Sequence, residues 1–388
     1  MTPRPSRVFG SLPTYPLADM PAKRRALEAR GVDLIDLGTG DADLPPPPAV
    51  IDRIRAAVGE SSFSRYPFQL GLADFREAVA AWMERRFGVR LHPYEEVLPL
   101  IGSKEGIAKL PLAFLDPGDV AVIPDPGYQA YRGGTILAGA EPHLVPLTAE
   151  NGFLIPLGEL PGGVADRTRI VYLNYPNNPT AATAPREYLA SAVAFCRERD
   201  AILVHDHAYS EIAFDGYRPP SVLEIEGARE VAIEFHSISK TYNMTGCRLG
   251  WAAGSREIVA ALSRVKTFMD TGVFLAVQAA GVAALESWED WVPRNVSEFQ
   301  RRRDAAVGAL RGAGFDVPLP RATMYVWMAV PIGETSEGFA GRALEEQGVV
   351  LLPGSALGRG GEGYVRLALT VPTPRLEEGA RRLGRLLS

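Results

Sequence analysis

Five short apolar runs, separated by helix-like patterns, limit most strongly what this 388-residue chain can fold into. They read VAVIP, HLVPL, RIVYLN, AILVHD and VAIEF and lie between Val120 and Phe235. Strands that are apolar on both faces are typical of a parallel sheet covered on both sides by helices. In such sheets ligands bind beyond the carboxyl ends of the strands. The pattern therefore predicts an α/β fold with a mostly parallel sheet and a binding site at one edge.

Polar clusters follow these runs where the predicted strands end. They are PDPGYQAY after the first run, NYPNNPT (Asn174 to Thr180) after the third, DHAYSE (Asp206 to Glu211) after the fourth and HSISKTYNMTGCR after the fifth. A further segment, VLPLIGSKEGI, is predicted to run from a strand through a glycine turn into a helix that begins at Ser103. Free N–H groups at a helix N-terminus favour an anion. We expect these clusters to converge on one cleft.

Segments on both sides of this region indicate a second, smaller unit. A helix is predicted over 17–30, a strand over 32–37 and another helix over 49–58, with the Gly/Pro-rich GTGDADLPPPP between the last two. Helical patterns dominate 256–310, and the strands MYVWMAV, VVLLP and YVRLALT follow. We predict an N-terminal segment (1–46) that packs with the small domain, a large cofactor-binding domain (47–283) and a small α+β domain (284–388).

Composition excludes several classes of protein. A net charge of −5 and a pI near 5.7 give no basic surface for nucleic acid or anionic lipid. The longest apolar run, Val273 to Leu285, is too short to span a bilayer, and no signal peptide is evident at the N-terminus. Cys196 and Cys247 have no metal-binding or redox spacing. The sequence predicts a cytoplasmic protein that binds neither membrane nor nucleic acid and has no metal site.

The clusters together offer the groups that pyridoxal phosphate requires. They contain an amine, a carboxylate, a phenol, an amide, an aromatic ring and an anion site: Lys240, Asp206, Tyr209, Asn178, Tyr128, and Ser103 with Ser237 and Arg248. This cofactor needs an amine for its aldehyde, an acid for its ring nitrogen, donors for its phenolic oxygen, a stacking ring and a phosphate cup. Few other cofactors need all of these.

From about Asp33 to the C-terminus, the chain resembles the fold-type I pyridoxal-phosphate enzymes of the class I/II aminotransferase family. SISKTYNMTGCR is similar to that family's cofactor-lysine signature, S-x-S-K-x7-R. IGSKEGI, DPGYQAY and YPNNPT are similar to the branch that contains LL-diaminopimelate, aspartate and alanine aminotransferases. The resemblance implies a large domain with a seven-stranded, mostly parallel sheet between helices.

The resemblance also implies roles for the residues that would contact the cofactor ring. Lys240 would bind the aldehyde covalently and, once released, move the proton between the substrate Cα and the cofactor as general base and acid. Asp206 would keep the pyridine nitrogen protonated. Asn178 and Tyr209 would hydrogen-bond the phenolic oxygen, and Tyr128 would stack on the ring.

The phosphate and the dimer are implied in the same way. Ser103, Lys104, Ser237 and Arg248 would bind the phosphate, with Arg248 as a forked, charge-assisted partner. Tyr66 would reach the phosphate of the neighbouring subunit's cofactor. The protein is therefore expected to be a homodimer with shared active sites.

Substrate contacts depend most heavily on the resemblance. Arg366 would clamp the substrate α-carboxylate in bidentate fashion, although an arginine on a strand is otherwise an outward-facing, solvated residue. Gly40 and Asn178 are further predicted substrate contacts. Lys104, Tyr131 and the Leu37–Leu44 loop are candidates for discriminating between substrates.

Two positions depart from the family pattern. Ala181 follows Pro179-Thr180 where glycine is common, so a Cβ must be tolerated in that turn. Cys247 precedes Arg248 where many relatives carry tryptophan. These departures affect the assignment to a subgroup more than the chemistry.

The sequence predicts a transaminase that moves an amino group between an amino acid and a 2-oxo acid, with 2-oxoglutarate and glutamate as partner pair. LL-diaminopimelate or its N-succinyl relative is favoured as donor. Aspartate, alanine and a β-lyase reaction on the same fold stay open, because the cofactor residues are shared. A transcription regulator with a fused DNA-binding domain is not expected, since only some thirty residues precede the first strand.

Overall fold

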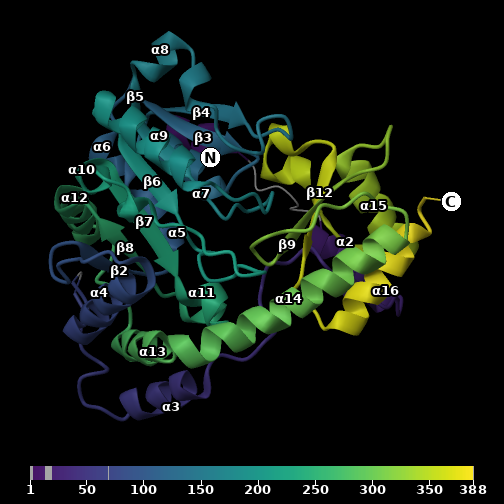
Figure 1. Cartoon of the computed structure of the whole chain (residues 1–388), viewed down its shortest axis with the longest axis horizontal. Coiled ribbons are helices and arrows are strands. Elements are labelled where there is room, and N and C mark those ends of the chain that lie inside the picture. Colours follow the sequence, from purple (N-terminus) through teal and green to yellow (C-terminus); the bar gives the residue numbers. More distant parts are fainter. Residues whose placement is uncertain (1–2, 14–19, 69, 388) are drawn as a thin grey trace.

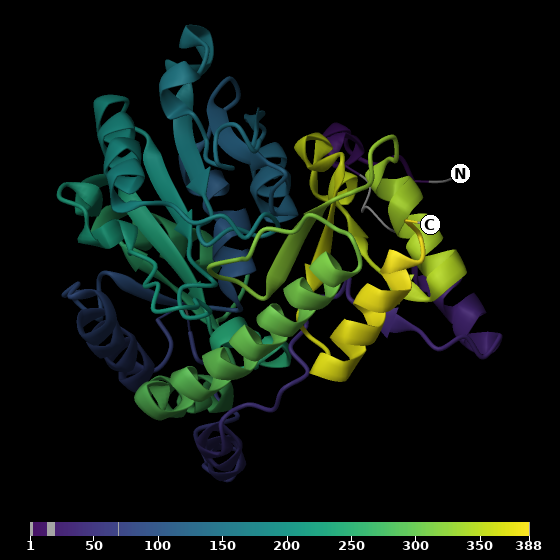
Figure 2. The same ribbon diagram turned by 45° about the vertical axis from the view of Figure 1, so that its right-hand side comes forward.

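The computed structural model describes residues 3–13, 20–68 and 70–387. The chain forms a larger part built on one central sheet and a smaller part beside it, and a long helix, α14 (Trp288–Gly312), passes from the first to the second (Figure 1). The smaller part consists of C-terminal residues and the N-terminal segment, which meet there although they are far apart in the sequence (Figure 2).

Seven strands form the central sheet, in the order β2-β8-β7-β6-β5-β3-β4. All pairs are parallel except those of β8, which is antiparallel to both β2 and β7. The predicted mostly parallel, seven-stranded sheet is thereby confirmed. The strands are β2 (Val97–Leu100), β3 (Val120–Asp125), β4 (Glu141–Pro146), β5 (Thr168–Leu173), β6 (Ile202–Asp206), β7 (Ala232–Ser237) and β8 (Gly250–Gly254).

The single antiparallel strand has a simple cause. The segment between β7 and β8 runs only from residue 238 to 249, and Ser237 pairs with Gly250. A parallel return needs a crossover across the sheet face, whereas an antiparallel partner needs only a turn. The chain therefore turns back at the carboxyl end of β7, and the segment with Lys240 stays at that edge.

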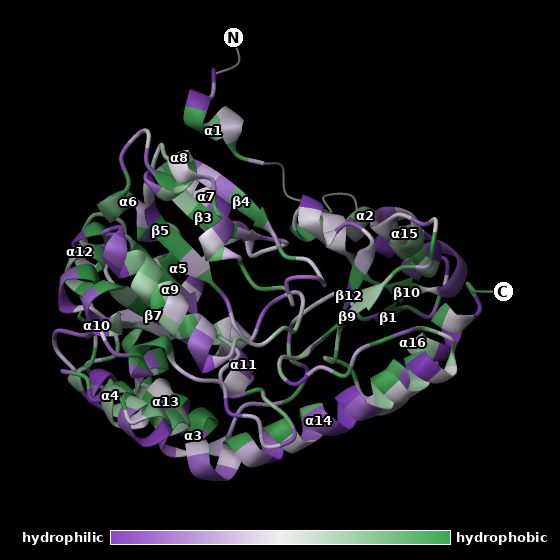
Figure 3. Cartoon of the chain, turned by 45° about the horizontal axis from the view of Figure 1, so that its top comes forward, coloured by the Kyte–Doolittle hydropathy of each residue, from purple (hydrophilic) through white to green (hydrophobic). Residues whose placement is uncertain are grey.

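Helices cover both faces of the sheet, as the apolar runs predicted. One face packs against α4 (Ala73–Phe87), α9 (Arg186–Glu198) and α13 (Leu275–Glu286). The other face packs against α5 (Ser103–Lys109), α7 (Gln129–Leu137) and α12 (Arg256–Thr267). Hydropathy follows this arrangement, with apolar strands between helices whose outer surfaces are polar (Figure 3).

The smaller part is built on a three-stranded antiparallel sheet, β11-β12-β9, against which α15 and α16 pack together with α14. Helix α16 lies alongside α14 in two views (Figures 1 and 2). Its elements are β9 (Tyr325–Ala329), α15 (Ser336–Gln347), β10 (Val349–Val350), β11 (Leu352–Pro353), β12 (Tyr364–Ala368) and α16 (Thr373–Gly384).

The N-terminal segment joins the smaller part through main-chain pairing. Strand β1 (Ile35–Asp36) is parallel to β10, and the Ala368 N–H donates to the Leu37 carbonyl at 2.6 Å. This contact supports the division that we propose, at 1–46, 47–283 and 284–388. The predicted helix over 17–30 is described from residue 20 onward, as α2 (Met20–Ala29), and its first residues lie outside the described part of the chain.

The remaining helices are short or lie at the periphery. No helix among the described residues is both long and apolar enough to cross a membrane. These helices are α1 (Arg7–Ser11), α3 (Pro48–Ala57), α6 (Pro111–Phe114), α8 (Gly162–Ala165), α10 (Ala228–Val231) and α11 (Ile238–Thr241).

Candidate active site

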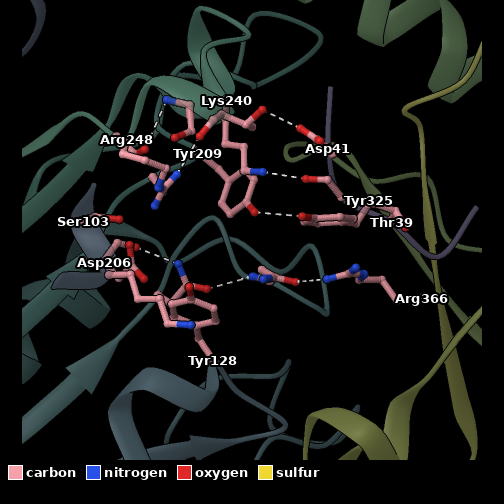
Figure 4. A pocket seen from close by; sticks show the side chains of 18 of the residues that line it. Thr39, Asp41, Ser103, Tyr128, Asp206, Tyr209, Lys240, Arg248, Tyr325 and Arg366 are labelled. Carbon is pink, nitrogen blue, oxygen red and sulfur yellow. Dashed lines mark hydrogen bonds between the residues drawn. The ribbon is translucent and has the colours of Figure 1, made fainter. Parts of the chain in front are cut away.

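A cavity of about 520 Å³ lies at the carboxyl ends of the parallel strands, where the large domain faces β9 and β12. Figure 4 shows side chains entering it from both sides. Its lining includes every residue predicted to contact the cofactor or substrate except Tyr66 and the candidate Tyr131. These are Gly40, Ser103, Lys104, Tyr128, Asn178, Asp206, Tyr209, Ser237, Lys240, Arg248 and Arg366.

Lys240 lies on the short helix α11, immediately after β7. The helix is capped by Ser237, whose hydroxyl accepts a hydrogen bond from the Ser239 N–H. The Lys240 Nζ donates to the Gly40 carbonyl at 2.6 Å, so the amine spans the cavity to the Leu37–Leu44 loop (Figure 4). An amine held only by a carbonyl oxygen in this position is accessible to a carbonyl carbon that enters the cavity.

Asp206 ends strand β6 and is buried with one oxygen satisfied. The Tyr131 hydroxyl donates to Oδ2 at 2.7 Å, and Asn174 Nδ2 donates to the Asp206 main-chain carbonyl at 2.7 Å. Oδ1 makes no hydrogen bond of ordinary geometry. Burial raises the pKa of Asp206 to about 6, although the Tyr131 hydrogen bond, the nearby histidines and the Ala208 N–H favour the charged form. An unpaired carboxylate oxygen in this setting calls for a cationic N–H donor.

The predicted anion site forms where α5 begins. Gly102 precedes the helix with φ of 72°, and a side chain there would collide with the Arg248 guanidinium. Arg248 itself adopts φ of 52° and donates from Nη1 to the Thr245 carbonyl at 2.7 Å. A helix N-terminus, the Ser103 hydroxyl and the guanidinium thus border the same part of the cavity. This is a cup with positive potential, which suits a phosphate.

Arg366 is turned inward from β12. It is only 7% exposed, so the outward-facing alternative does not hold. Its Nη1 donates to Asn178 Oδ1 and its Nη2 to the Gly38 carbonyl, both at 2.8 Å, and the guanidinium lies 4.1 Å from the centre of the Tyr325 ring. Its Nε is buried without a partner. The group is fixed in orientation and still has a donor to offer.

Tyr325 is a site residue that the sequence did not indicate. Its hydroxyl lies 3.0 Å from that of Tyr209, and burial raises the pKa of Tyr209 well above its ordinary value. A Cβ on Gly40 would collide with the Tyr325 hydroxyl, so the loop has room only for glycine at this position. Tyr325 and Arg366 come from strands paired in the register Arg366 to Trp327. That register is not readable from the sequence, and no local motif marks the tyrosine.

Two of the residues considered for the site lie outside this cavity. Tyr131 was a candidate for substrate discrimination, but its side chain is fully buried outside the cavity, where it supports Asp206 and stacks on Tyr172 at 4.8 Å between ring centres. Tyr66 is 71% exposed and does not line this chain's cavity.

The two departures from the family pattern have different consequences. Ala181 adopts φ of 58°, a left-handed conformation that glycine reaches without strain. The alanine Cβ therefore makes this turn less favourable than glycine would. Cys247 is half-buried against the large-domain core and does not line the cavity. Neither residue changes the groups that face the cavity.

The groups present fit pyridoxal phosphate. The unpaired Asp206 Oδ1 matches a protonated ring nitrogen, and the cup around Ser103 and Arg248 matches a phosphate. Tyr128 offers an aromatic ring, and the Lys104 Nζ lies 5.6 Å from the centre of that ring. The amine of Lys240 completes the set.

Comparison with known proteins agrees with this fit. A sequence model of the aminotransferase class I and II family matches residues 32–383. The LL-diaminopimelate aminotransferase of Desulforudis audaxviator is 52% identical over 373 residues, which cover 96% of this chain and 95% of that protein. Substrate-bound BacF from Bacillus subtilis superposes with a TM-score of 0.94 at 34% identity, covering 100% of this chain and 98% of that one. A probable N-succinyldiaminopimelate aminotransferase from Thermus thermophilus superposes with a TM-score of 0.90 at 37% identity. The match covers 97% of this chain and 99% of that one.

The raised pKa of Asp206 predicts a pH-dependent effect of Asp206→Asn on the cofactor-free protein. The folded state holds this proton up to about pH 6, whereas the unfolded chain releases it near 3.8, so ionisation of Asp206 costs stability as pH rises through this window. Asparagine does not ionise. Urea unfolding should therefore show the variant gaining about 2 kcal/mol relative to the parent between pH 4 and pH 7.5.

The exposed Asp316 provides the matched control. Asp316→Asn should change this pH dependence by no more than a few tenths of a kcal/mol. A variant-to-parent difference for Asp206→Asn that stays constant across the pH range would contradict the assignment of a raised pKa.

Proposed function

The chain belongs to the aminotransferase class I and II family and uses pyridoxal phosphate, and we propose that its amino donor is LL-diaminopimelate or the N-succinyl form. The observation that carries this proposal is the 52% identity to an LL-diaminopimelate aminotransferase across nearly the whole of both chains. Glutamate and 2-oxoglutarate are the proposed partner pair. An amino acid and a 2-oxo acid are the substrates common to the family.

Asp206 and Lys240 would have separate roles in the reaction. Pyridoxal phosphate, when bound, supplies the aldehyde that joins the amino group and a ring that accepts electrons from the substrate Cα. Asp206 would hold the ring nitrogen in its protonated form through Oδ1. Lys240 Nζ would take the proton from the substrate Cα. It lies in the cavity at the carboxyl end of β7 and is hydrogen-bonded to the Gly40 carbonyl.

Arg366 orients the substrate by its α-carboxylate. The bonds to Asn178 and Gly38 fix the guanidinium plane. A carboxylate would pair with the free Nε and displace one of these contacts, as a bidentate partner. Asn178 and Tyr209 would bind the cofactor's phenolic oxygen. Because Asn178 also accepts from Arg366, a single amide links carboxylate recognition to the cofactor ring.

An exposed aromatic surface supports a homodimer. Tyr66, Phe68 and Phe268 are 71%, 64% and 84% exposed, and Met269 and Phe274 are also exposed. Residues 63–68 and 268–274 lie side by side, because the Phe63 ring packs edge-on against the Phe274 ring, with 6.1 Å between the ring centres. An apolar surface of this kind typically marks an interface. In the proposed dimer a second copy covers it, and Tyr66 contacts the phosphate in the partner's active site.

The proposed location is the cytoplasm. Cys196 and Cys247 are both free, and Cys196 is buried. A protein without disulfides is typical of a reducing compartment.

The donor assignment predicts the outcome of a screen of amino donors with 2-oxoglutarate. LL-diaminopimelate, N-succinyl-LL-diaminopimelate, aspartate and alanine would be compared by glutamate formation. The favoured donor should exceed aspartate in kcat/KM by about 100-fold, because a site built for a long polar side chain leaves its polar groups unpaired with a short one.

Arg366→Ala should raise KM for every donor, since all share the α-carboxylate. Aspartate or alanine as the best donor would overturn the diaminopimelate assignment and leave transamination intact. Release of ammonia and pyruvate, with no glutamate formed, would instead identify a β-lyase.

The dimer proposal predicts that Phe268→Asp combined with Met269→Asp yields monomers in light scattering after size exclusion. Charges buried in an apolar interface are strongly unfavourable. Ile332→Asp is the control, because Ile332 is fully exposed elsewhere. Tyr66→Phe should stay dimeric and bind the cofactor about tenfold more weakly, through loss of one hydrogen bond to a charged group. An unchanged mass for the double variant would refute this interface.

A further inference from the structure

Four titratable side chains lie buried together beside the cofactor site, and the reaction proposed above uses none of them. His205 and His207 flank Asp206 in the chain, and Glu234 and His236 lie on the neighbouring strand β7. His205, His207 and Glu234 are fully buried, and His236 is 2% exposed. We call these four residues the histidine–glutamate cluster.

Apolar rings enclose the cluster on the face of the sheet that α4 covers. His236 packs against Trp82 and stacks on Trp251, and His207 packs against Phe87. The charged group nearest to these rings on α4 is Arg86, which lies over the Phe87 ring and pairs with Glu211. Charges within the cluster must therefore be balanced by its own members and by Asp206 beside it.

The hydrogen bonds of His205 determine its protonation. Nε2 lies 2.9 Å from the Tyr175 carbonyl oxygen, which can only accept, so Nε2 carries a proton. Nδ1 lies 2.9 Å from Glu234 Oε2. If Glu234 is a carboxylate, this nitrogen carries a proton as well, and His205 is an imidazolium.

The surroundings of Glu234 favour the carboxylate. Its oxygens accept hydrogen bonds from the Ser221 hydroxyl at 2.9 Å and from the Val222 N–H at 3.0 Å, and His236 Nε2 lies 2.6 Å from Oε1. Burial opposes ionisation, but the histidines around it hold the pKa of Glu234 well below its usual range. Glu234 and His205 are thus a buried ion pair with every polar atom satisfied.

A metal ion is the alternative for such a cluster. One ligand atom each from His205, His207 and Glu234 lie within 4.8 Å of one another. Both nitrogens of His205 and both oxygens of Glu234 are already engaged, however. His207 makes no ordinary hydrogen bond to the described residues through its ring nitrogens, although its Nδ1 lies 3.4 Å from Glu234 Oε1. Burial lowers the pKa of His207 to about 3, so it is a neutral ring stacked on His205. The hydrogen bonds therefore favour an ion pair over a metal site.

The pair connects the segments that carry the proposed cofactor contacts. Tyr175 begins the loop to Asn178, whose N–H donates to the Asn174 side chain at 2.8 Å. His205 immediately precedes Asp206, and Glu234 lies on the strand that leads to Lys240. His205, near the end of β6, therefore contacts both the loop that follows β5 and strand β7.

We propose that His205 is a positioning residue that Glu234 keeps doubly protonated, so that its two N–H groups hold the Tyr175 loop and strand β7 in register around Asp206. The inference rests on the site roles proposed above for Asn178, Asp206 and Lys240. It adds that the relative positions of these residues depend on the positive charge of His205, which does not contact the cofactor. The imidazolium also favours the ionised form of Asp206 beside it.

Nitrogen NMR of the cofactor-loaded, ¹⁵N-histidine-labelled protein tests this directly. The chain has five histidines: His92, His143, His205, His207 and His236. At pH 7.5 one of them should show two protonated ring nitrogens, and His205→Gln should remove that signal. If no histidine shows both protons at this pH, or if the signal belongs to another histidine, the proposal is overturned. It is also overturned if metal analysis finds one bound ion per chain.

Glu234→Gln separates positioning from packing. In this variant the doubly protonated His205 signal should be lost, and the cofactor dissociation constant should rise about tenfold. Glu226→Gln, at an exposed position on the same segment, should change neither. A Glu234→Gln protein that keeps the doubly protonated ring would contradict the proposal. These measurements need no amino donor, so failure of the substrate assignment leaves them unaffected.

Discussion

Parallel pairing of β5, β6 and β7 is the constraint on which the site depends. Leu173 pairs with His205, and Asp206 pairs with Phe235, so the three strands end at nearly the same level. The segments that follow carry the amide, the carboxylate and the amine. Because β8 returns antiparallel after a short turn, the amine stays at this edge instead of being carried across the sheet. The register of the strands thus brings these chemical groups together, although they are far apart in the sequence.

Two polar atoms buried at this edge lack hydrogen-bond partners within the described part of the chain and could bind a ligand. Asp206 Oδ1 and Arg366 Nε have no hydrogen-bond partner among the described residues, although burial of an unpaired charge is costly. The neighbouring pair of Glu234 and His205 shows the opposite pattern, because each polar atom there has a partner. We infer that the first set is kept for a bound molecule and that the second maintains the shape of the site.

The sequence predicted the sheet and the helices that cover it, because buried parallel strands carry an apolar pattern that is visible in one dimension. It also predicted which strand ends carry chemistry, and the family resemblance supplied the roles. Tyr325 was not predictable, since its place beside Arg366 depends on the register of two strands separated by about forty residues.

Contacts across domains escaped prediction for a related reason. The Lys240 amine meets the Gly40 carbonyl only because β1 pairs with β10 and brings the N-terminal loop over the cavity. Tyr131 was a candidate for substrate discrimination, but its hydroxyl donates to Asp206 Oδ2 and its ring stacks on Tyr172 outside the cavity. No sequence pattern indicates that its side chain supports Asp206 from behind.

The central claim is that Lys240 is the amine that binds pyridoxal phosphate. Borohydride reduction of the cofactor-loaded protein, followed by peptide mass mapping, tests it most directly, because reduction makes the lysine link permanent. The chain has only five lysines, at 23, 104, 109, 240 and 266, and Lys104 also lines the cavity. The account predicts a single pyridoxyl group on Lys240. Labelling of Lys104, or label spread over several lysines, would contradict it.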